Sequence, residues 1–196
     1  MKKIRIIAAE DDPDYRFIIE RYLAMNQELE LLAIFDNAED TLQAAVTQHP
    51  DIVLMDLNLG SGIMEGAELA RTIRRKTDSR IIILTGFDAP EIVINACRRA
   101  FASAYVLKQQ ADILIPTILS TAMGITPQSS LILASLLEPL TAAERTVFGR
   151  LMGNPVKLHS ADKTIANQQS SIIRKMELAS KEELYHIFSA YYPSEG

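Results

Sequence analysis

Two short stretches of the chain are apolar at every position, and this constrains the fold more than any other feature. They are Ile52–Met55 (IVLM) and Ile81–Leu84 (IIIL). A strand with one face in water alternates apolar and polar side chains, so an unbroken apolar run indicates a strand buried on both faces. Such strands are typical of parallel sheets that carry helices on both sides. We therefore expect helical segments around these two strands.

Strand-like and helix-like segments alternate over the first half of the chain, as this interpretation requires. Five strands separated by helices predict right-handed crossovers and an α/β domain with a doubly wound, five-stranded parallel sheet. The expected strands are Ile4–Ala8, Glu30–Phe35, Ile52–Met55, Arg80–Thr85 and Ala104–Val106, and the expected helices are Pro13–Met25, Ala38–Gln48, Glu65–Lys76 and Pro90–Ala100.

The pattern becomes purely helical towards the carboxyl terminus. A fifth helix is expected over Ala111–Met123, where Pro116 indicates a late start or a kink. A short apolar linker helix is expected over Ser129–Leu137, and a further helix begins near residue 140, with Thr141 and Glu144 at the positions of a capping box. We expect a first domain at 1–123, a linker at 124–139 and a small all-α domain at 140–196.

The charge is negative overall but unevenly spread. The net charge of −5 argues against nucleic-acid binding by the whole chain. Residues 1–139 hold 13 Lys+Arg against 19 Asp+Glu, giving −6, whereas residues 140–196 hold 7 against 6, giving +1. The second domain is thus nearly neutral, which is a weak footprint for DNA binding.

The cysteine count and the length of the apolar runs indicate the cellular compartment. The one cysteine, Cys97, cannot form an internal disulfide, and we expect it to be a buried small hydrophobe rather than a nucleophile. No apolar run approaches the ~20 residues that cross a bilayer. The apolar stretch near the amino terminus is too short for a signal peptide. A cytoplasmic protein without a membrane partner is expected.

Chemically distinctive side chains follow the carboxyl ends of four expected strands. Glu10, Asp11 and Asp12 follow the first strand and Asp56 the third. Thr85 closes the fourth strand, and Lys108 lies just past the fifth. In a doubly wound sheet these ends converge on one edge, where ligands bind.

Carboxylates gathered at one edge repel each other unless a cation lies among them. Oxygen ligands without a histidine or cysteine partner indicate Mg²⁺. Lys108 can neutralise an incoming anion, and the hydroxyl of Thr85 can hydrogen-bond it. Together these groups predict a phosphoryl-transfer site in which one carboxylate is the nucleophile and forms an acyl phosphate.

This set of residues at these strand ends resembles the receiver domain of two-component response regulators, over roughly residues 3–123. The resemblance implies that Asp56 accepts a phosphoryl group from a histidine kinase or a phosphotransfer protein. It implies Mg²⁺ bound directly by Asp11 and Asp56, by the backbone carbonyl of Asn58 and, through water, by Glu10. Asp12 is expected to cap the first helix instead.

The resemblance also implies how the signal leaves the site. Thr85 and Tyr105 would form the switch pair, Thr85 moving towards the phosphoryl oxygen and Tyr105 turning inward behind it, while Lys108 bridges to the phosphate. Phosphorylation is expected to produce a homodimer. No enzymatic activity on a separate substrate is implied: the domain accepts a phosphoryl group and can catalyse its own phosphorylation and dephosphorylation.

Four positions depart from the receiver pattern. Gly60 stands where receivers usually have proline, and Gly66 comes about two residues late, which indicates a reshaped loop after the phosphoacceptor. Phe101 and Ala104 replace two usual glycines. Two interpretations stay open for Phe101, an exposed anchor for a partner or dimer, and core packing.

The carboxyl-terminal segment resembles the helix-turn-helix domain of LuxR-type regulators. Leu140–Arg145 resembles its opening, Thr164–Met176 its recognition helix, and Leu178–Leu184 the run into its last helix. The resemblance implies DNA contacts by Lys163, Thr164, Asn167, Gln168, Arg174 and Lys175.

This second domain is shortened, and its output therefore has two interpretations. Gly153–Ser160 replaces the usual supporting helix with a loop that contains proline, and Ala166 lacks the usual basic side chain. In the first interpretation, phosphorylation controls DNA binding and transcription. In the second, the degenerate domain no longer binds DNA and mediates a phosphorylation-regulated protein contact or dimerisation.

Overall fold

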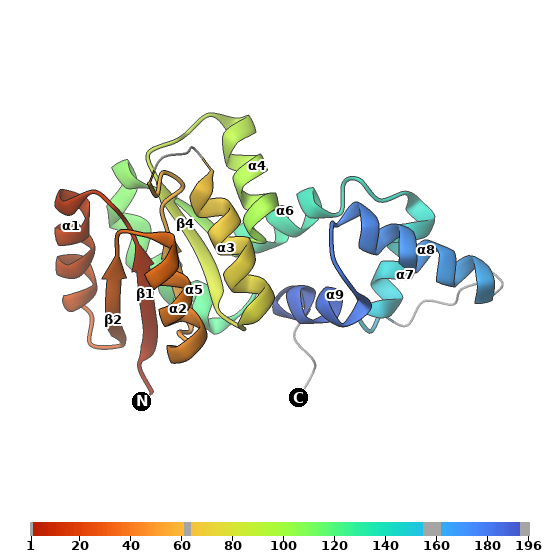
Figure 1. The fold of residues 1–196 in the computed structure, drawn as a ribbon, viewed down its shortest axis with the longest axis horizontal. Coiled ribbons are helices and arrows are strands. Elements are labelled where there is room, and N and C mark those ends of the chain that lie inside the picture. Colours follow the sequence, from red (N-terminus) through yellow and green to blue (C-terminus); the bar gives the residue numbers. More distant parts are fainter. Residues whose placement is uncertain (1, 61–63, 155–161, 193–196) are drawn as a thin grey trace. The chain divides into compact units, whose positions relative to one another are not determined.

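The computed structural model describes residues 2–60, 64–154 and 162–192. The chain divides into two compact units, Met1–Ile132 and Leu133–Gly196. Within the described ranges, no helix has both the length and the apolar character that crossing a bilayer requires. Figure 1 shows the strands and most helices of the first unit from red to green, and the helices of the second unit from teal at α7 (Ala142–Leu151) to blue at α9 (Lys181–Phe188).

The first unit is built on a parallel five-stranded sheet in the order β2-β1-β3-β4-β5. The α/β doubly wound fold expected from the sequence is confirmed. The elements in chain order are β1 (Ile4–Ala9), α1 (Pro13–Ala24), β2 (Leu29–Phe35), α2 (Ala38–Gln48), β3 (Ile52–Met55), α3 (Glu65–Lys76), β4 (Arg80–Thr85), α4 (Pro90–Ala100) and β5 (Ala104–Leu107).

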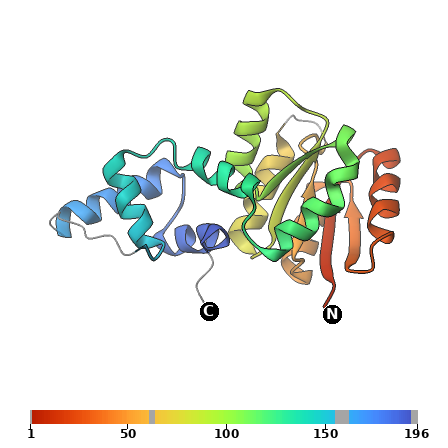
Figure 2. The ribbon, with the colours of Figure 1, turned by 180° about the vertical axis from the view of Figure 1, so that it is seen from behind.

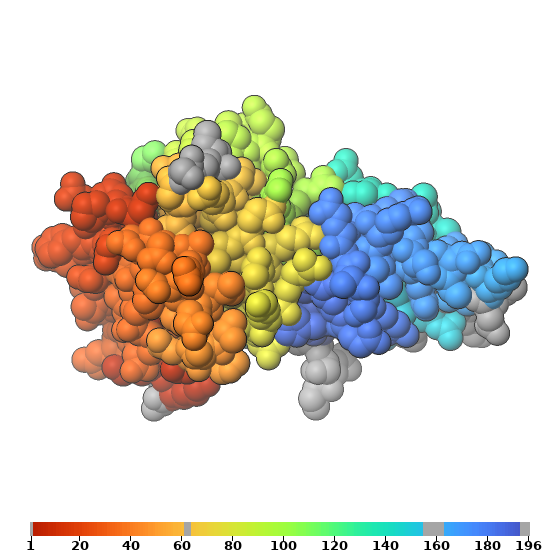
Figure 3. Space-filling model, in the orientation of Figure 1, coloured from red at the N-terminus to blue at the C-terminus, as the bar shows by residue number. Residues whose placement is uncertain are grey.

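Helices cover both faces of this sheet. Figure 1 shows α2 and α3 in front of it, and Figure 2, from behind, shows α5 (Leu114–Met123) in front. Space-filling atoms of α2 and α3 close over the sheet in Figure 3. On the α1 and α5 side, Ile19 and Ile118 pack with strand residues such as Leu54, which is 1% exposed. The two apolar runs are buried at every position, as the sequence predicts.

The chain after β5 starts its helix late. A 3₁₀ segment covers Lys108–Ile113, and α5 begins only at Leu114. Pro116 therefore lies in the first turn of α5, where a backbone N–H has no helical partner to lose. Of the two possibilities that the sequence left for this proline, the late start is the correct one.

The structure decides two predictions about burial, for Cys97 in α4 and for Phe101 directly after it. Cys97 is buried, and burial raises the pKa of its thiol to about 12, so it is an inert hydrophobe as expected. Phe101 is 1% exposed, with the Arg71 guanidinium 4.8 Å from its ring centroid. The interpretation of Phe101 as an exposed anchor is therefore wrong, and the core-packing interpretation is correct.

The division between the units falls within α6 (Pro127–Leu136), and the described second unit is otherwise helical. Its elements are α7 (Ala142–Leu151), α8 (Asp162–Lys175), α9 (Lys181–Phe188) and a 3₁₀ turn at Ser189–Tyr191. The rings of Phe148 and Phe188 meet edge to face, 5.0 Å apart, and join α7 to α9. The predicted loop over Gly153–Ser160 lies largely outside the described residues, from position 155 onward.

Glu144 joins the first turn of α7 to the last turn of α8. With Thr141 it forms the predicted capping box, accepting from the Thr141 backbone N–H at 2.7 Å. Its carboxylate also accepts from Ser171 Oγ at 2.7 Å and from Lys175 Nζ at 2.6 Å. The hydrogen bonds from Lys175, Ser171 and Thr141 lower the pKa of this buried carboxyl to about 2. The ionised form thus stabilises the α7–α8 pair.

Glu144→Ala should lower the local stability of α7 and α8 by about 1–3 kcal/mol, since the variant loses the cap and leaves Lys175 without its carboxylate. The folded pKa is depressed, so the contribution is full above the ordinary value of 4.5 and is lost as the pH falls towards 2. Hydrogen exchange of the α7 and α8 amides at pH 7 and pH 3 measures both effects.

Glu144→Gln is the matched control, because it keeps the side-chain size and one acceptor oxygen while removing the charge. It should lose less protection than Glu144→Ala at pH 7. A difference between the wild type and Glu144→Ala that stays constant from pH 7 to pH 3 would contradict this role.

Candidate functional site

The ends of β1, β3, β4 and β5 converge at one edge of the sheet, as the sequence predicts. The backbone N–H of Asp56, directly after β3, donates to Ala9 O at 3.0 Å, next to Glu10. Thr85 pairs in register with Leu107, the residue before Lys108. The topology therefore brings together side chains that are up to 98 residues apart in the chain.

An ammonium group lies between two buried carboxylates at this edge. Lys108 Nζ lies 2.7 Å from Asp56 Oδ2, and 2.8 Å and 2.6 Å from the two carboxylate oxygens of Glu10. The exposed fractions of the side chains are 17% for Lys108, 5% for Asp56 and 1% for Glu10. Since little water reaches these groups, the attraction between them is only weakly screened.

The pKa shifts in this group show which effect dominates at each residue. Burial raises the pKa of Glu10, and the hydrogen bond and charge of Lys108 offset only part of that rise. Burial alone would lower the pKa of Lys108, but the hydrogen bonds to Asp56 and Glu10 together with the negative charges of these carboxylates outweigh it, and the pKa is raised. Lys108 therefore keeps its positive charge where an anion would arrive.

Three carboxylates at this edge fit a hard metal cation. Glu10, Asp11 and Asp56 each offer an oxygen within 4.8 Å of the others. Asp11 Oδ2 accepts from the backbone N–H of Gly60 at 3.4 Å. Oxygen donors in such a group suit Mg²⁺ better than zinc or copper.

The other two residues considered as ligands have different positions. Asp12 caps α1, accepting from the backbone N–H of Asp14 at 2.9 Å, so its predicted capping role is confirmed. Asn58 is exposed, and its backbone N–H donates to Asp56 Oδ1 at 3.3 Å. A metal contact through the Asn58 carbonyl stays a prediction.

The two residues of the predicted switch pair lie at the ends of adjacent strands. Thr85 is 1% exposed at the end of β4. Tyr105 in β5 donates a short hydrogen bond from its hydroxyl to the carbonyl oxygen of Phe87, and burial raises the pKa of that hydroxyl. At the edge of the sheet, the backbone N–H of Tyr105 donates to Gln128 Oε1 at 3.0 Å. Their movement on phosphorylation stays a prediction.

Sequence reasoning missed Tyr15, which contacts Lys108 twice. Its hydroxyl donates to the Lys108 carbonyl oxygen at 3.1 Å, and Lys108 Nζ lies 4.6 Å from its ring centroid. Burial, followed by the charge of Glu10, raises the pKa of this hydroxyl to about 12, so it stays a donor. The signal in the sequence was its place three residues after the Asp12 cap, on the turn that begins beside the site.

Sequence reasoning noted Gly66 but not what its backbone touches. A Cβ atom at Gly66 would lie 1.8 Å from the carbonyl oxygen of Asp56, far inside van der Waals contact. The backbone N–H of Gly66 also donates to Leu57 O at 3.2 Å. The start of α3 thus packs directly against the backbone of Asp56, and no side chain fits between them.

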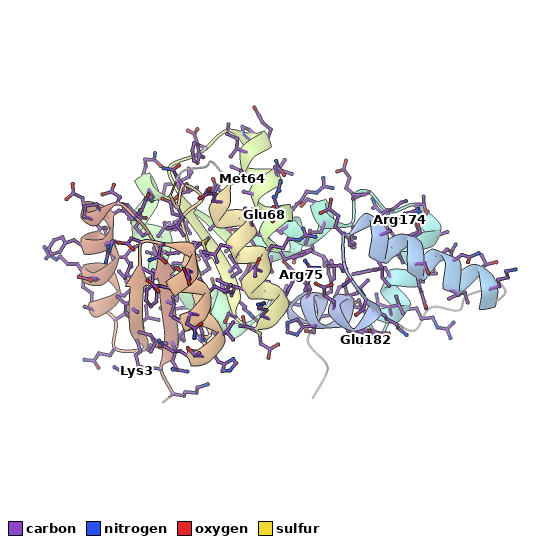
Figure 4. All side chains as sticks on the ribbon, viewed as in Figure 1. Lys3, Met64, Glu68, Arg75, Arg174 and Glu182 are labelled. Carbon is purple, nitrogen blue, oxygen red and sulfur yellow. The ribbon has the colours of Figure 1, made fainter. Side chains whose placement is uncertain are left out.

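The residues considered for DNA contact divide into two groups. Lys163, Thr164, Asn167 and Arg174 are exposed on α8. Three of them, Lys163, Asn167 and Arg174, form with the exposed Ser170 an i, i+4, i+7, i+11 stripe along one face. Arg174 is labelled on α8 in Figure 4. Gln168 is half-buried, and the Lys175 ammonium is held by Glu144 and by Pro139 O at 3.2 Å.

Comparison with known proteins places this site in a family. Residues 6–119 match the model of the response regulator receiver domain. The chain therefore belongs to the response regulator receiver family.

Similarity to some known proteins extends over nearly the whole chain and not only over the receiver domain. The transcriptional regulatory protein DegU of Brevibacillus brevis is 32% identical over 124 residues, which are 62% of this chain and 51% of that protein. The uncharacterized transcriptional regulatory protein YvfU of Bacillus subtilis (strain 168) is 27% identical over 192 residues, 92% of this chain and 94% of that protein. The Salmonella typhimurium response regulator RcsB shares the fold, with a TM-score of 0.56 and 22% identity over 96% of this chain and 99% of that one.

The chain covers only part of the first relatives that it matches. It spans about half of the length of DegU and 61% of the nitrate/nitrite response regulator NarL of Escherichia coli K12, to which it is 27% identical over 70% of its own length.

Gly66→Ala should lower the free energy of unfolding of the first unit by about 1–3 kcal/mol, because the new methyl group forces α3 and the Asp56 backbone apart. This loss runs against helix propensity, which favours alanine. Thermal and urea unfolding of the full chain measure it. Gly86→Ala is the matched control, since its Cβ would meet nothing closer than 3.9 Å. Equal stability of the two variants would contradict the close approach at Asp56.

Proposed function

We propose that this protein is a two-component response regulator in which phosphorylation of Asp56 controls DNA binding by the second unit, and thereby transcription. The observation that carries the proposal is the Lys108 ammonium bound to both Asp56 and Glu10 inside a group of three carboxylates. On this proposal the receiver comprises residues 1–123, the linker 124–139 and the output domain 140–196.

The proposed reaction is transfer of a phosphoryl group to the Asp56 carboxylate. One Asp56 oxygen forms a bond to phosphorus, and the bond from phosphorus to the donor atom breaks, with its electron pair leaving on the donor. The donor is the phosphohistidine of a histidine kinase or of a phosphotransfer protein. Lys108 Nζ, 2.7 Å from Asp56 Oδ2, is in reach of the new phosphoryl oxygens and neutralises their charge.

Asp11 and Asp56 would hold Mg²⁺ directly, with the Asn58 carbonyl as a further ligand and Glu10 acting through water. The fit rests on the oxygen donors of Glu10, Asp11 and Asp56. When bound, the ion supplies charge neutralisation at the phosphoryl oxygens. The residues of the chain fix the carboxylates: the Gly60 N–H holds Asp11, and the Asn58 N–H holds Asp56.

The signal would leave through Thr85 and Tyr105. The buried Thr85 hydroxyl moves towards a phosphoryl oxygen, and the Tyr105 hydroxyl exchanges its bond to Phe87 O for a position turned inward. Thr85 lies on β4 and Tyr105 on β5, which are neighbours at one edge of the sheet. Their movement would therefore alter the surface formed by these two strands and α4. A homodimer formed by the changed surface would present two output units.

DNA binding is assigned to α8, with the exposed Lys163 and Arg174 as phosphate contacts. The exposed Thr164 and Asn167 and the half-buried Gln168 are assigned as hydrogen-bonding side chains. Support comes from DegU and YvfU, which are named transcriptional regulatory proteins, and from RcsB, which has been solved as a DNA complex. Lys175 contributes through its bond to Glu144, which holds α8 against α7.

Asp56→Asn should abolish covalent labelling by acetyl phosphate with Mg²⁺, because the amide is a poor nucleophile. Mass spectrometry detects the added phosphoryl group. Asp12→Asn is the matched control: it keeps an effective helix cap and should label like the wild type. Persistent labelling of Asp56→Asn would sink the assignment of the phosphoacceptor.

Beryllofluoride with Mg²⁺ should tighten binding of mixed genomic DNA fragments, measured by fluorescence anisotropy at low salt. The Lys163→Ala/Arg174→Ala double variant should weaken binding and reduce the salt slope by about 2, whereas Arg150→Ala, an exposed arginine of α7, should change it little. No binding in either state would overturn the DNA assignment and leave a phosphorylation-regulated protein contact or dimerisation as the output.

A further inference from the structure

We propose that Tyr15 is a positioning residue for phosphoryl transfer, which holds the Lys108 ammonium in place between its ring and the two carboxylates. The inference rests on the proposed function, since it assigns a role in phosphorylation of Asp56. Its basis is that one side chain touches both ends of Lys108, the backbone carbonyl and the ammonium.

The start of α1 fixes the position of Tyr15. Pro13 occupies the first helical position, and the Asp12 carboxylate caps the turn, accepting from the Tyr15 backbone N–H at 3.4 Å. The Tyr15 side chain is 9% exposed and packs in the core cluster with Ile19. A capped turn and a buried ring leave this residue little freedom, so it can restrain a more flexible neighbour.

The hydroxyl of Tyr15 restrains the backbone of Lys108. It donates to the Lys108 carbonyl oxygen at 3.1 Å, at the point where β5 ends at Leu107 and the 3₁₀ segment begins. The carbonyl carbon of Lys108 is bonded to its Cα, from which the side chain branches just past the end of β5. The hydrogen bond thus sets where the Lys108 side chain starts.

The ring of Tyr15 restrains the ammonium itself. A lysine side chain has four rotatable bonds, so a carboxylate alone does not fix its direction. Here Nζ lies 4.6 Å from the ring centroid while it contacts Glu10 and Asp56 on its other sides. A cation at this distance from a tyrosine ring is attracted to it, most strongly where water is excluded.

This contact gains importance when phosphorylation starts. Attack by Asp56 turns one of its charged oxygens into the bridging oxygen of an acyl phosphate, and the carboxylate loses its negative charge, which weakens its attraction for Lys108. The ring carries no charge that changes in the reaction, so its attraction for the ammonium persists. Lys108 can then shift from Asp56 Oδ2 to a phosphoryl oxygen without leaving the site.

Two variants separate the ring from the hydroxyl. Tyr15→Phe keeps the ring and should slow phosphorylation by acetyl phosphate about two- to fivefold, the effect of one lost hydrogen bond. Tyr15→Leu removes both contacts and should reduce the maximal rate by about tenfold or more. Tyr22→Leu, two turns further along the same helix, is the matched control and should react like the wild type.

Three readouts separate positioning from a general loss of structure. The reduction should appear in the maximal rate of phosphorylation. The Mg²⁺ affinity, measured by titration calorimetry, should change by no more than about twofold, because the two Tyr15 contacts that matter here are with Lys108 and not with the carboxylates. Thermal unfolding should show that Tyr15→Leu, although less stable than Tyr22→Leu because Tyr15 is the more buried ring, is still fully folded at the assay temperature. In the NMR spectrum, the Lys108 ammonium protons should be shielded by the ring in the wild type and Tyr15→Phe but not in Tyr15→Leu.

Wild-type rates in Tyr15→Leu, or an unshifted Lys108 ammonium signal in the wild type, would overturn the proposal. A rate in Tyr15→Phe as low as in Tyr15→Leu would overturn the role of the ring. The NMR readout uses the unphosphorylated protein, so it tests the contact even if the wild type is not labelled at Asp56. Absence of labelling together with the expected ring shift would reject the proposed function and not the contact.

Discussion

Parallel strands end on the same side of their sheet, and in this chain several of the residues that follow those ends are acidic. Glu10, Asp11 and Asp56 consequently offer oxygens within 4.8 Å of one another, an arrangement that costs free energy unless positive charge is present. Lys108 supplies that charge from the end of β5, 2.6–2.8 Å from two of the carboxylates. The fold and the chemistry of the site therefore have one origin: the topology that forces like charges together also delivers the cation that balances them.

Much of this site could be predicted from the sequence because it depends on local patterns. Unbroken apolar runs identify buried strands, and buried parallel strands fix the edge at which Asp56, Thr85 and Lys108 meet. Two helix starts could be predicted equally well, since the Asp12 and Thr141 side chains accept hydrogen bonds from backbone N–H groups only two or three residues further along. These inferences require only that neighbouring residues behave as their types dictate, with no knowledge of which distant segments touch.

The features that the sequence did not reveal depend on distances between separate elements. The contact of Tyr15 with Lys108 joins residues that are 93 positions apart in the sequence. The lack of space for a side chain at Gly66 depends on how closely the start of α3 approaches the backbone of Asp56, directly after β3. Phe101 is buried although a residue after a helix is commonly exposed, because the loop turns its ring under Arg71. Lys175 has a basic side chain on α8, for which DNA binding is proposed, yet its ammonium donates to Glu144. Residue type states what each group can do, and tertiary packing selects its partner.

The burial of Cys97 has a practical consequence for following the protein in solution. It is the only cysteine in the chain, it is 4% exposed, and its thiol has a pKa of about 12. A thiol in that state reacts slowly with maleimides, which attack the thiolate. A cysteine introduced at an exposed position, such as one on α8, becomes the reactive thiol without any need to remove Cys97. A single fluorophore or spin label can thus be attached to either unit while the native core stays intact.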